Sequence, residues 1–522
     1  MLIRGARVAD GSGAALIAAD LLLSGERIIA VGPPGSYDGL DGPVTDASGL
    51  VVAPGFIDVH SHADNAPLLP AGEDDTSKIL QGVTTEVTGN CGYSMAPVGA
   101  EHEAAFTAFW GRRCPRVPWG WHTFAEFLAV ADGHGHVVNY APLAGHGALR
   151  FAVLGLADRA PDAAELAAMR GLLDEALSAG AFGMSSGLVY PPGMFAATAE
   201  LTELARSLPP GRLYATHMRG EGAGLLASIE EALRIGGTAG CRVQISHLKS
   251  SGRPNWGRVG AALSLLDQAR RDGADVGQDA YPYDRSSTGL TVCLPRWALT
   301  DGDAAVLVRL ADPGTVDRMR AETLAGENSL TSAGYDGILI ASTRTHAYEG
   351  QTLAEIGADL GMDPFDALVR VLREERLGVS IVISSMSEPD VTEVLAHPAT
   401  MIGSDGLPPG RGGKPHPRMY GTFPRVLGRY VRERGVLSLP DAISRMTSRP
   451  ASAFGLTDRG RVAAGAVADL VAFDPERIAD AGDYRDPVRS PAGIAWVMQA
   501  GQFAVRDGRW LGTRLGRRLD PR

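Results

Sequence analysis

Residues 56–62 read Phe-Ile-Asp-Val-His-Ser-His and place two histidines at the end of a short apolar run. Side chains alternate between the two faces of a strand, so His60 and His62 are expected to point the same way. A lone histidine is more often a surface or core residue, but two imidazoles in this spacing after an apolar strand indicate metal ligation. The segment therefore predicts a strand that ends in metal ligands.

The middle of the chain, roughly residues 56–440, repeats this strand pattern. Eight apolar segments are predicted as strands, each followed by helix-like sequence: FIDVH, TTEVTG, HVVNYAP, GAFGMSS, RLYATH, RVQISH, ADVGQDAY and TMIGSD. Such alternation predicts an α/β fold with a parallel sheet, and eight units predict a closed (β/α)8 TIM-like barrel. Between about residues 291 and 337 the pattern loosens, which we interpret as an insertion over the barrel mouth.

Both ends of the chain have a different sequence pattern. Residues 1–55 and 441–522 alternate short apolar runs with glycine-containing turns, as β-hairpins do. We therefore expect a small β-sandwich domain built from both termini, beside a catalytic domain that spans 56–440.

Composition excludes several classes of partner. The 522 residues carry a formal net charge of −11 without a dense basic cluster, so we expect no nucleic-acid partner. No run approaches the roughly 20 apolar residues that cross a bilayer, and the N-terminus lacks a signal-peptide core, so we expect no membrane partner. Four separate cysteines without a CxxC pair favour a cytoplasmic location. The sequence leaves open whether the chain forms a homo-oligomer.

Further polar residues follow the predicted strands. His217 ends RLYATH, His247 ends RVQISH and Asp405 ends TMIGSD. Active sites of such barrels form at the carboxyl ends of the strands. Asp405 alone could be a turn residue or helix cap, but four histidines and one aspartate at strand ends together predict a zinc site.

Longer motifs resemble a known family. The segments PGFIDVHSHAD, THMRGEG, SHLKSSG and GSDGLPPGRGGKPHPR resemble the N-acyl-D-amino-acid deacylase (D-aminoacylase) family of the amidohydrolase superfamily. The similarity extends over nearly the whole chain, and TGNCGYSMAPV, SSGLVYPPG and PHPRMYGTFPRVLGRY are more specific to the deacylases than the terminal segments are. The resemblance implies a small-molecule N-acyl amino acid as substrate.

The resemblance also assigns metal ligands. It implies a tightly held zinc on Cys91, His217 and His247, and a weaker second metal site with His60, His62 and Asp405. A cysteine can equally be a buried apolar residue. Cys91, however, stands in a glycine-rich segment between Asn90 and Gly92, where a thiolate is available as a zinc ligand. We expect Asp405 to act as general base and then as general acid on the departing amine.

Cationic side chains would face the carboxylate of such a substrate. Lys249 and Arg418 match the family's carboxylate-binding positions, with Tyr281 or Tyr283 as a hydroxyl partner and Tyr190 on the acyl side. A single lysine or arginine is usually a solvated surface charge. Lys249 differs because it lies two residues beyond a predicted metal ligand.

The function predicted from the sequence is zinc-dependent hydrolysis of N-acyl-D-amino acids to a carboxylate and a free D-amino acid. A hydantoinase-like or dihydroorotase-like cyclic amidase is an alternative, against which stand Cys91 and the lack of an obvious bridging lysine. A dipeptidase on the same site stays open, because fold alone does not determine the substrate. A non-enzymatic metal-binding scaffold is disfavoured because every ligand position is filled.

Overall fold

The computed structural model describes residues 1–70, 72–114 and 116–521. Each of the eight segments predicted as strands overlaps a strand that pairs in parallel with a neighbouring strand. These strands are β6 (Phe56–Asp58), β7 (Val83–Thr88), β8 (Asn139–Pro142), β10 (Gly183–Gly187), β11 (Leu213–His217), β12 (Arg242–Ile245), β13 (Val276–Ala280) and β17 (Thr400–Ile402). They are almost entirely buried, as expected of parallel strands that are covered by helices.

The parallel strands belong to two sheets. One has the order β6-β7-β8, and the other has the order β17-β13-β12-β11-β10-β9, where β9 is the short strand Ala144–Gly145. Leu143 alone separates β8 from β9 along the chain. At the other end, a parallel bridge joins Ser61, just after β6, to Gly406, just after β17. The two sheets therefore meet at both of their ends.

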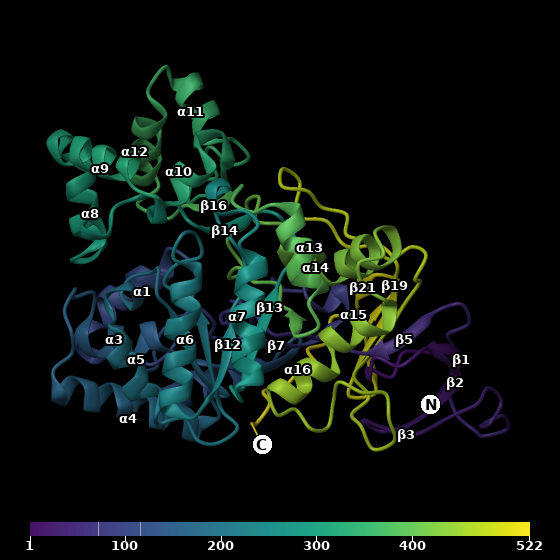
Figure 1. The fold of residues 1–522 in the computed structure, drawn as a ribbon. Helices are drawn as coiled ribbons and strands as arrows, with labels where there is room; N and C mark the ends of the chain where they lie inside the picture. The colour runs from purple at the N-terminus through teal and green to yellow at the C-terminus, as the bar shows by residue number, and fades with distance from the viewer. Residues whose placement is uncertain (71, 115, 522) are drawn as a thin grey trace.

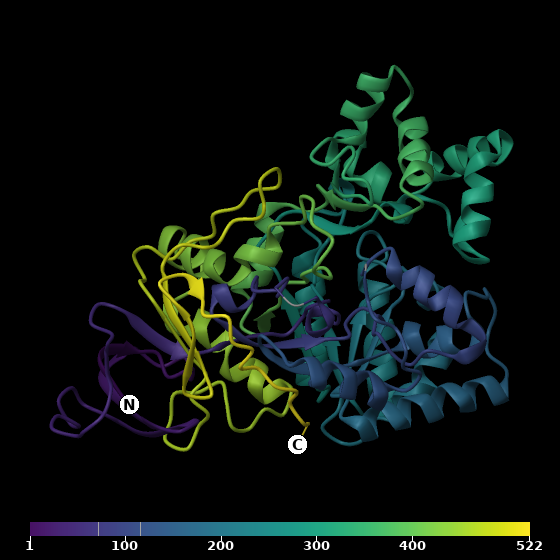
Figure 2. The same ribbon diagram turned by 180° about the vertical axis from the view of Figure 1, so that it is seen from behind.

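Helices surround these strands in both ribbon views (Figures 1 and 2). They are α1 (Glu103–Gly111), α2 (Phe124–His134), α3 (His146–Leu154), α4 (Ala163–Ala179), α5 (Thr198–Ala205), α6 (Leu225–Ala239), α7 (Val259–Arg271), α13 (Glu388–Ala396), α14 (Arg418–Arg425), α15 (Leu439–Met446) and α16 (Ser448–Ala453). In α6 the residues Leu225, Ile229 and Ala232 are buried on one face, which is the spacing of an amphipathic helix. Asp162 and Glu165 form a capping box at the start of α4.

Strands from the two ends of the chain form one nine-stranded sheet. The N-terminal part contributes β1 (Leu2–Val8), β2 (Ile17–Ser24), β3 (Arg27–Gly32), β4 (Val44–Asp46) and β5 (Val51–Pro54), and the C-terminal part contributes β18 (Leu470–Phe473), β19 (Ile494–Gln499), β20 (Gln502–Arg506) and β21 (Arg509–Trp510). The antiparallel pair β5–β18 joins the two ends, and these purple and yellow strands lie together in Figure 1. The predicted boundary at residue 441 falls inside α15, which packs against β6 and β17.

The segment between β13 and α13 contains a further sheet and five α-helices. They are β14 (Ser286–Gly289), β15 (Ile338–Ser342), β16 (Ser380–Ile383), α8 (Gly302–Ala311), α9 (Pro313–Ala325), α10 (Ser329–Ala333), α11 (Leu353–Leu360) and α12 (Pro364–Glu374). The sheet is antiparallel in the order β14-β16-β15, and the segment has its own apolar core. These elements stand together at the top of Figure 1 and extend beyond the 291–337 range predicted for the insertion.

All four cysteines are free. Among the described residues, none of the helices has the length and apolar character needed to cross a membrane.

Candidate metal centre

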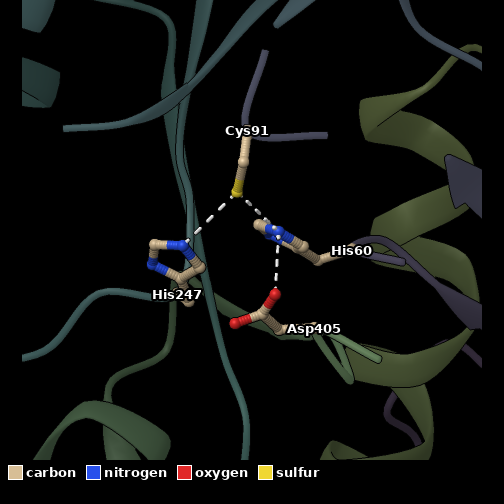
Figure 3. Close-up of side chains that lie close together, drawn as sticks. All are labelled: His60, Cys91, His247 and Asp405. Atoms are coloured by element: carbon tan, nitrogen blue, oxygen red, sulfur yellow. Dashed lines mark hydrogen bonds and ion pairs between the residues drawn. The ribbon is translucent and has the colours of Figure 1, made fainter. Parts of the chain in front are cut away.

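Metal-binding side chains converge from the ends of separate strands. His60 follows β6, Cys91 follows β7, His217 ends β11, His247 follows β12 and Asp405 follows β17. All of these residues are less than a tenth exposed. Figure 3 shows His60, Cys91, His247 and Asp405 pointing toward one another from different parts of the fold.

The Cys91 sulfur is central to this cluster. Its Sγ lies 3.3 Å from His60 Nε2, 3.6 Å from His247 Nε2 and 3.7 Å from His217 Nδ1. A tetrahedral zinc with Zn–S of about 2.3 Å and Zn–N of about 2.0–2.1 Å separates the two donor atoms by about 3.5 Å. The spacing of these side chains therefore fits a shared metal ion.

Asp405 completes the donor set. Its Oδ1 lies 3.1 Å from His62 Nε2 and 3.5 Å from His60 Nε2, and its Oδ2 lies 2.9 Å from Arg418 Nη1. The ligand atoms of His60, Cys91, His247 and Asp405 all lie within 4.8 Å of one another. Sulfur, imidazole nitrogen and carboxylate oxygen together are a donor set that suits zinc.

A second group shares a histidine with the first. Ligand atoms of His217, Glu221 and His247 also lie within 4.8 Å of one another. The sequence analysis assigns Cys91 to one metal site with His217 and His247, and His60 to another. In the structure the Cys91 sulfur is as close to His60 as to His217 and His247, so the two sets of ligands lie next to each other.

Three of the donor residues have left-handed backbone conformations. The φ angles are 53° at Cys91, 37° at His247 and 49° at Asp405. Residues other than glycine adopt this region at a cost, and such strain persists only where the surroundings hold it. Here Asp405 N–H donates to His60 O at 2.7 Å, and His247 N–H donates to Asp279 Oδ1 at 2.8 Å. These bonds hold the strand ends that direct the donors inward.

Two acidic residues that the sequence analysis missed support the histidines. His60 Nδ1 lies 3.2 Å from Asp279 Oδ1, and His247 Nδ1 lies 3.0 Å from Glu221 Oε1. In each ring the other nitrogen, Nε2, faces the Cys91 sulfur. A carboxylate behind a ligating imidazole fixes its tautomer and orientation. Glu221 follows His217 by four residues in THMRGEG, and Asp279 lies at the end of β13, which is the signal that could have identified them.

Electrostatics favour charged donors. Burial opposes ionisation of the Cys91 thiol, but the positive His60 and His62 outweigh it and hold the pKa of Cys91 well below its ordinary value. Burial likewise raises the pKa of Asp405, but Arg418 and His62 hold it well below its ordinary value. A thiolate and a carboxylate are therefore the expected forms at neutral pH.

The two predicted carboxylate-binding cations are buried near Tyr281. Lys249 Nζ lies 5.8 Å and Arg418 Cζ lies 4.7 Å from the centroid of the Tyr281 ring. Both cations already contact acidic residues: Lys249 Nζ donates to Glu221 Oε1 at 2.5 Å, and Arg418 pairs with Asp405. Burial raises the pKa of Tyr281 to about 12, and its hydroxyl has no hydrogen-bond partner among the described residues. This hydroxyl is thus protonated and free to donate.

The two remaining tyrosines lie in different places. The Tyr190 ring packs 5.0 Å from that of His217, and its hydroxyl accepts a hydrogen bond from Thr288 at 3.2 Å. Tyr283 is buried away from the donors, and its hydroxyl donates to Pro417 O at 3.4 Å. Of the two hydroxyl candidates, the structure therefore brings only Tyr281 to the two cations.

Two cavities open onto the metal centre. The first, of about 400 Å³, is lined by residues that include His62, Tyr93 and Leu407. The second, of about 360 Å³, is lined by residues that include His217, His247, Glu221, Lys249 and Tyr281. Tyr190 and Asp405 line both, so the metal centre lies between the two cavities.

The chain is similar to known proteins over nearly its whole length. A model of the amidohydrolase family matches residues 43–505. A D-aminoacylase from Alcaligenes xylosoxydans xylosoxydans is 38% identical over 520 residues, covering 99% of this chain and 97% of the relative. A crystal structure of a D-aminoacylase superposes with a TM-score of 0.84 at 37% identity over 99% of both chains. N-acyl-D-glutamate deacylase from Bordetella bronchiseptica, complexed with zinc and a phosphonate inhibitor, superposes with a TM-score of 0.83 at 36% identity, covering 99% of this chain and 98% of the other.

Proposed function

Because the chain belongs to the amidohydrolase family, we propose that it hydrolyses N-acyl-D-amino acids to a carboxylate and a free D-amino acid. The observation that carries this proposal is the cluster of Cys91, His60, His247 and Asp405 at the strand ends. Buried cations beside Asp405 add a means of binding a free carboxylate next to the scissile amide. The names of the full-length relatives give the substrate class.

We also propose a closed (β/α)8 barrel with a separate terminal β domain. The pairing of Ser61 with Gly406, and the near continuity of β8 and β9, support closure of the parallel sheets into one ring. The insertion would then span β14 to β16, and the terminal domain would combine residues 1–55 with the strands from β18 onward.

For the cofactor, we propose one tightly held zinc on Cys91, His217 and His247, and a weaker second site with His60, His62 and Asp405. The donor chemistry and the spacing around the Cys91 sulfur support this assignment. Bound zinc supplies Lewis acidity, which polarises an amide carbonyl and acidifies water.

The chain's own residues would then move the proton. Asp405, kept ionised by Arg418 and His62, takes the proton of the attacking water and delivers it to the departing nitrogen. The C–N bond breaks, the new C–O bond makes the carboxylate, and the amine leaves protonated. His62 and Arg418 hold the carboxylate of Asp405 in position from opposite oxygens.

The substrate's α-carboxylate would lie near Lys249, Arg418 and Tyr281. An arginine binds a carboxylate through a planar fork, whereas a lysine supplies a compact charge. The unpartnered Tyr281 hydroxyl supports this placement because it would otherwise stay buried without an acceptor.

A substrate panel tests the proposal. N-acetyl-D- and N-acetyl-L-amino acids, a hydantoin and a D-containing dipeptide are compared by kcat/KM. We expect turnover of the N-acetyl-D-amino acids with little of the L series. Faster turnover of the hydantoin would favour the cyclic amidase, and faster turnover of the dipeptide would favour a dipeptidase.

We place the enzyme in the cytoplasm as part of the same proposal, because its four cysteines are free. Cell fractionation tests this placement.

A further inference from the structure

In the proposed reaction, the two cavities would hold different parts of the substrate. Lys249 and Tyr281, which we assign to the α-carboxylate, line the second cavity and not the first. Because the metal centre lies between the cavities, the other side of the scissile amide would then face the first cavity. That side carries the acyl group, so the wall of the first cavity decides which acyl groups are accepted.

Three arginines form part of this wall. Arg112, Arg113 and Arg411 all line the first cavity, and each is partly buried. Arg112 pairs with Asp303 of the insertion at 3.0 Å. We call these three residues the arginine wall.

Two of the three have no acidic partner. Arg113 donates to Phe109 O and to the Tyr93 hydroxyl, both at 3.3 Å. Arg411 donates to Gly378 O at 2.6 Å. Among the described residues, neither guanidinium has a carboxylate at ion-pair distance. Partly buried charges without counterions are unfavourable, and an anion would relieve this.

Mutual repulsion shows in the same groups. Burial and the neighbouring Arg113 lower the pKa of Arg112 to about 10, and the same two causes lower the pKa of Arg411. An arginine side chain keeps its positive charge in proteins.

The acidic residues that line this cavity are engaged elsewhere. Glu73 pairs with Arg116 at 2.5 Å, and Asp74 pairs with Arg514 at 2.6 Å. Asp75 accepts a backbone N–H at 3.0 Å. None of these three carboxylates therefore pairs with Arg113 or Arg411.

One aromatic ring connects the arginine wall to the metal centre. Arg113 Cζ lies 5.1 Å from the centroid of the Tyr93 ring, and that ring lies 6.4 Å from the ring of His62. A short acyl chain that starts at the metal centre could thus pass Tyr93 and reach the guanidinium groups.

We propose that the arginine wall binds a second carboxylate at the far end of the acyl group, so that the preferred substrates are N-acyl-D-amino acids of dicarboxylic acids. This inference rests on the proposed deacylase function. Water adds across the amide as before, so an N-glutaryl-D-amino acid yields glutarate and the free D-amino acid. The reaction needs no further co-reactant.

Kinetics on matched substrates test the inference. N-glutaryl-D-leucine and its neutral methyl ester on the glutaryl end have nearly the same shape and differ in one charge. We expect kcat/KM at least about tenfold higher for the free acid at low salt, with the ratio falling as salt screens the attraction. N-succinyl and N-adipoyl analogues report the best length.

Variants identify the residues responsible. Arg113→Gln and Arg411→Gln should each lower kcat/KM on the free acid about tenfold, with a smaller loss on the ester, and Arg411→Lys should recover part of it. Arg489→Gln is the matched control, because Arg489 lines the same cavity but is exposed and paired with Asp486. Equal losses on acid and ester would overturn the inference and leave these arginines as supports of the insertion.

Two further outcomes separate the inference from the proposed function. Faster turnover of N-acetyl-D-glutamate than of N-glutaryl-D-leucine would overturn the inference, because the arginine wall would then bind the side chain of the amino acid instead of the acyl group. If N-acetyl-D-leucine is not hydrolysed at all, the proposed function fails instead. Calorimetry with glutarate and pentanoate then still tests whether the arginine wall binds a carboxylate. Tighter binding of glutarate than of pentanoate, with the difference lost in Arg113→Gln, would support the inference. Equal binding of the two acids would overturn it.

Discussion

Asp405 contacts His62 through one carboxylate oxygen and Arg418 through the other. Both neighbours favour its ionised form, so the carboxylate can accept a proton but is held in a fixed position while it does so. A general base must reach both the water and the leaving group, and its location between the two cavities satisfies this requirement.

Asp405→Asn keeps the shape of the side chain and removes the proton acceptor. We expect turnover to fall about 10²-fold or more, because general acid–base transfer typically contributes about 10²–10⁴ in rate. Steady-state kinetics together with the zinc content of the purified variant provide the measurement. Turnover within a factor of two of wild type would exclude Asp405 as the general base.

Glu221 has a different role, since it contacts both His247 and Lys249. Glu221→Gln removes the negative charge behind the imidazole and leaves the Lys249 ammonium 2.7 Å from His247 Nδ1 without its counterion. Loss of such a support typically weakens metal affinity about 10–100-fold. Titration of zinc against a competing chelator measures this loss.

Glu327→Gln is the control for that substitution. Glu327 lines the same cavity but bonds to Asn255 and to the backbone of Ala223. The Glu327→Gln variant should bind zinc with the wild-type affinity. An unchanged affinity in Glu221→Gln as well would show that the carboxylate does not support His247.

The histidines and Asp405 could be picked out from the sequence because each ends or follows an apolar strand, as His217 and His247 do, whereas Cys91 was assigned through the family resemblance. The acidic and cationic partners of these residues could not be predicted. Lys249 bonds to Glu221 across two strand ends, and Asp279 reaches His60 from a strand more than two hundred residues later. Such pairs depend on which loops meet in space. For the same reason Tyr281 and Tyr283 could not be told apart until the chain was folded.

At the scale of elements, the Cys91 loop lies against the end of β10. A Cβ added at Gly187 would lie 2.0 Å from Cys91 O, which backbone atoms cannot accommodate without moving. Only glycine allows this approach. The position of the sulfur therefore depends on a residue of a different strand.

Gly187→Ala should displace the Cys91 loop and reduce zinc binding together with activity. Gly171→Ala, in the middle of α4, is the control, because an added Cβ there meets nothing within 4 Å and alanine favours a helix. Metal content and kcat/KM are measured for both variants. Wild-type zinc content in Gly187→Ala would show that the loop can shift without losing the ligand.

The predicted strands belong to apolar segments that helix-like sequence follows, whereas β14, β15 and β16 form an antiparallel sheet outside that repeat. β14 is Ser-Ser-Thr-Gly and offers no apolar run, yet it pairs with β16, which begins at Ser380. The range predicted for the insertion, about residues 291–337, does not include β14, β15 or β16. The boundary predicted at residue 441 falls within α15, which continues the helix-like pattern of the middle region and packs against β6 and β17.

At the scale of the whole molecule, the metal centre joins strands that span most of the chain, from His60 after β6 to Asp405 after β17. An ion held by these donors would link parts of the fold that are otherwise connected only through the sheets. A ligand that binds the native state alone stabilises it, by about 2.7 kcal/mol when present at a hundred times its dissociation constant. Metal binding and stability should therefore change together.

Removal of metal with a strong chelator should abolish activity and lower the melting temperature, and zinc should restore both. The physical reason is that zinc would bind the Cys91 thiolate, the histidines and Asp405 together only in the folded chain, so that its binding free energy adds to the stability of the fold. The melting temperature, by differential scanning calorimetry, and the activity are followed through one cycle of chelation and zinc addition.

Cys91→Ser should show a low melting temperature that zinc no longer raises to the wild-type value. Cys241→Ser, which changes a cysteine outside both metal-binding groups, should respond to zinc like the wild type. Full activity in protein shown to be free of metal would contradict the proposed chemistry, and a metal-dependent activity without a change in stability would show that the strand ends are held by the fold alone.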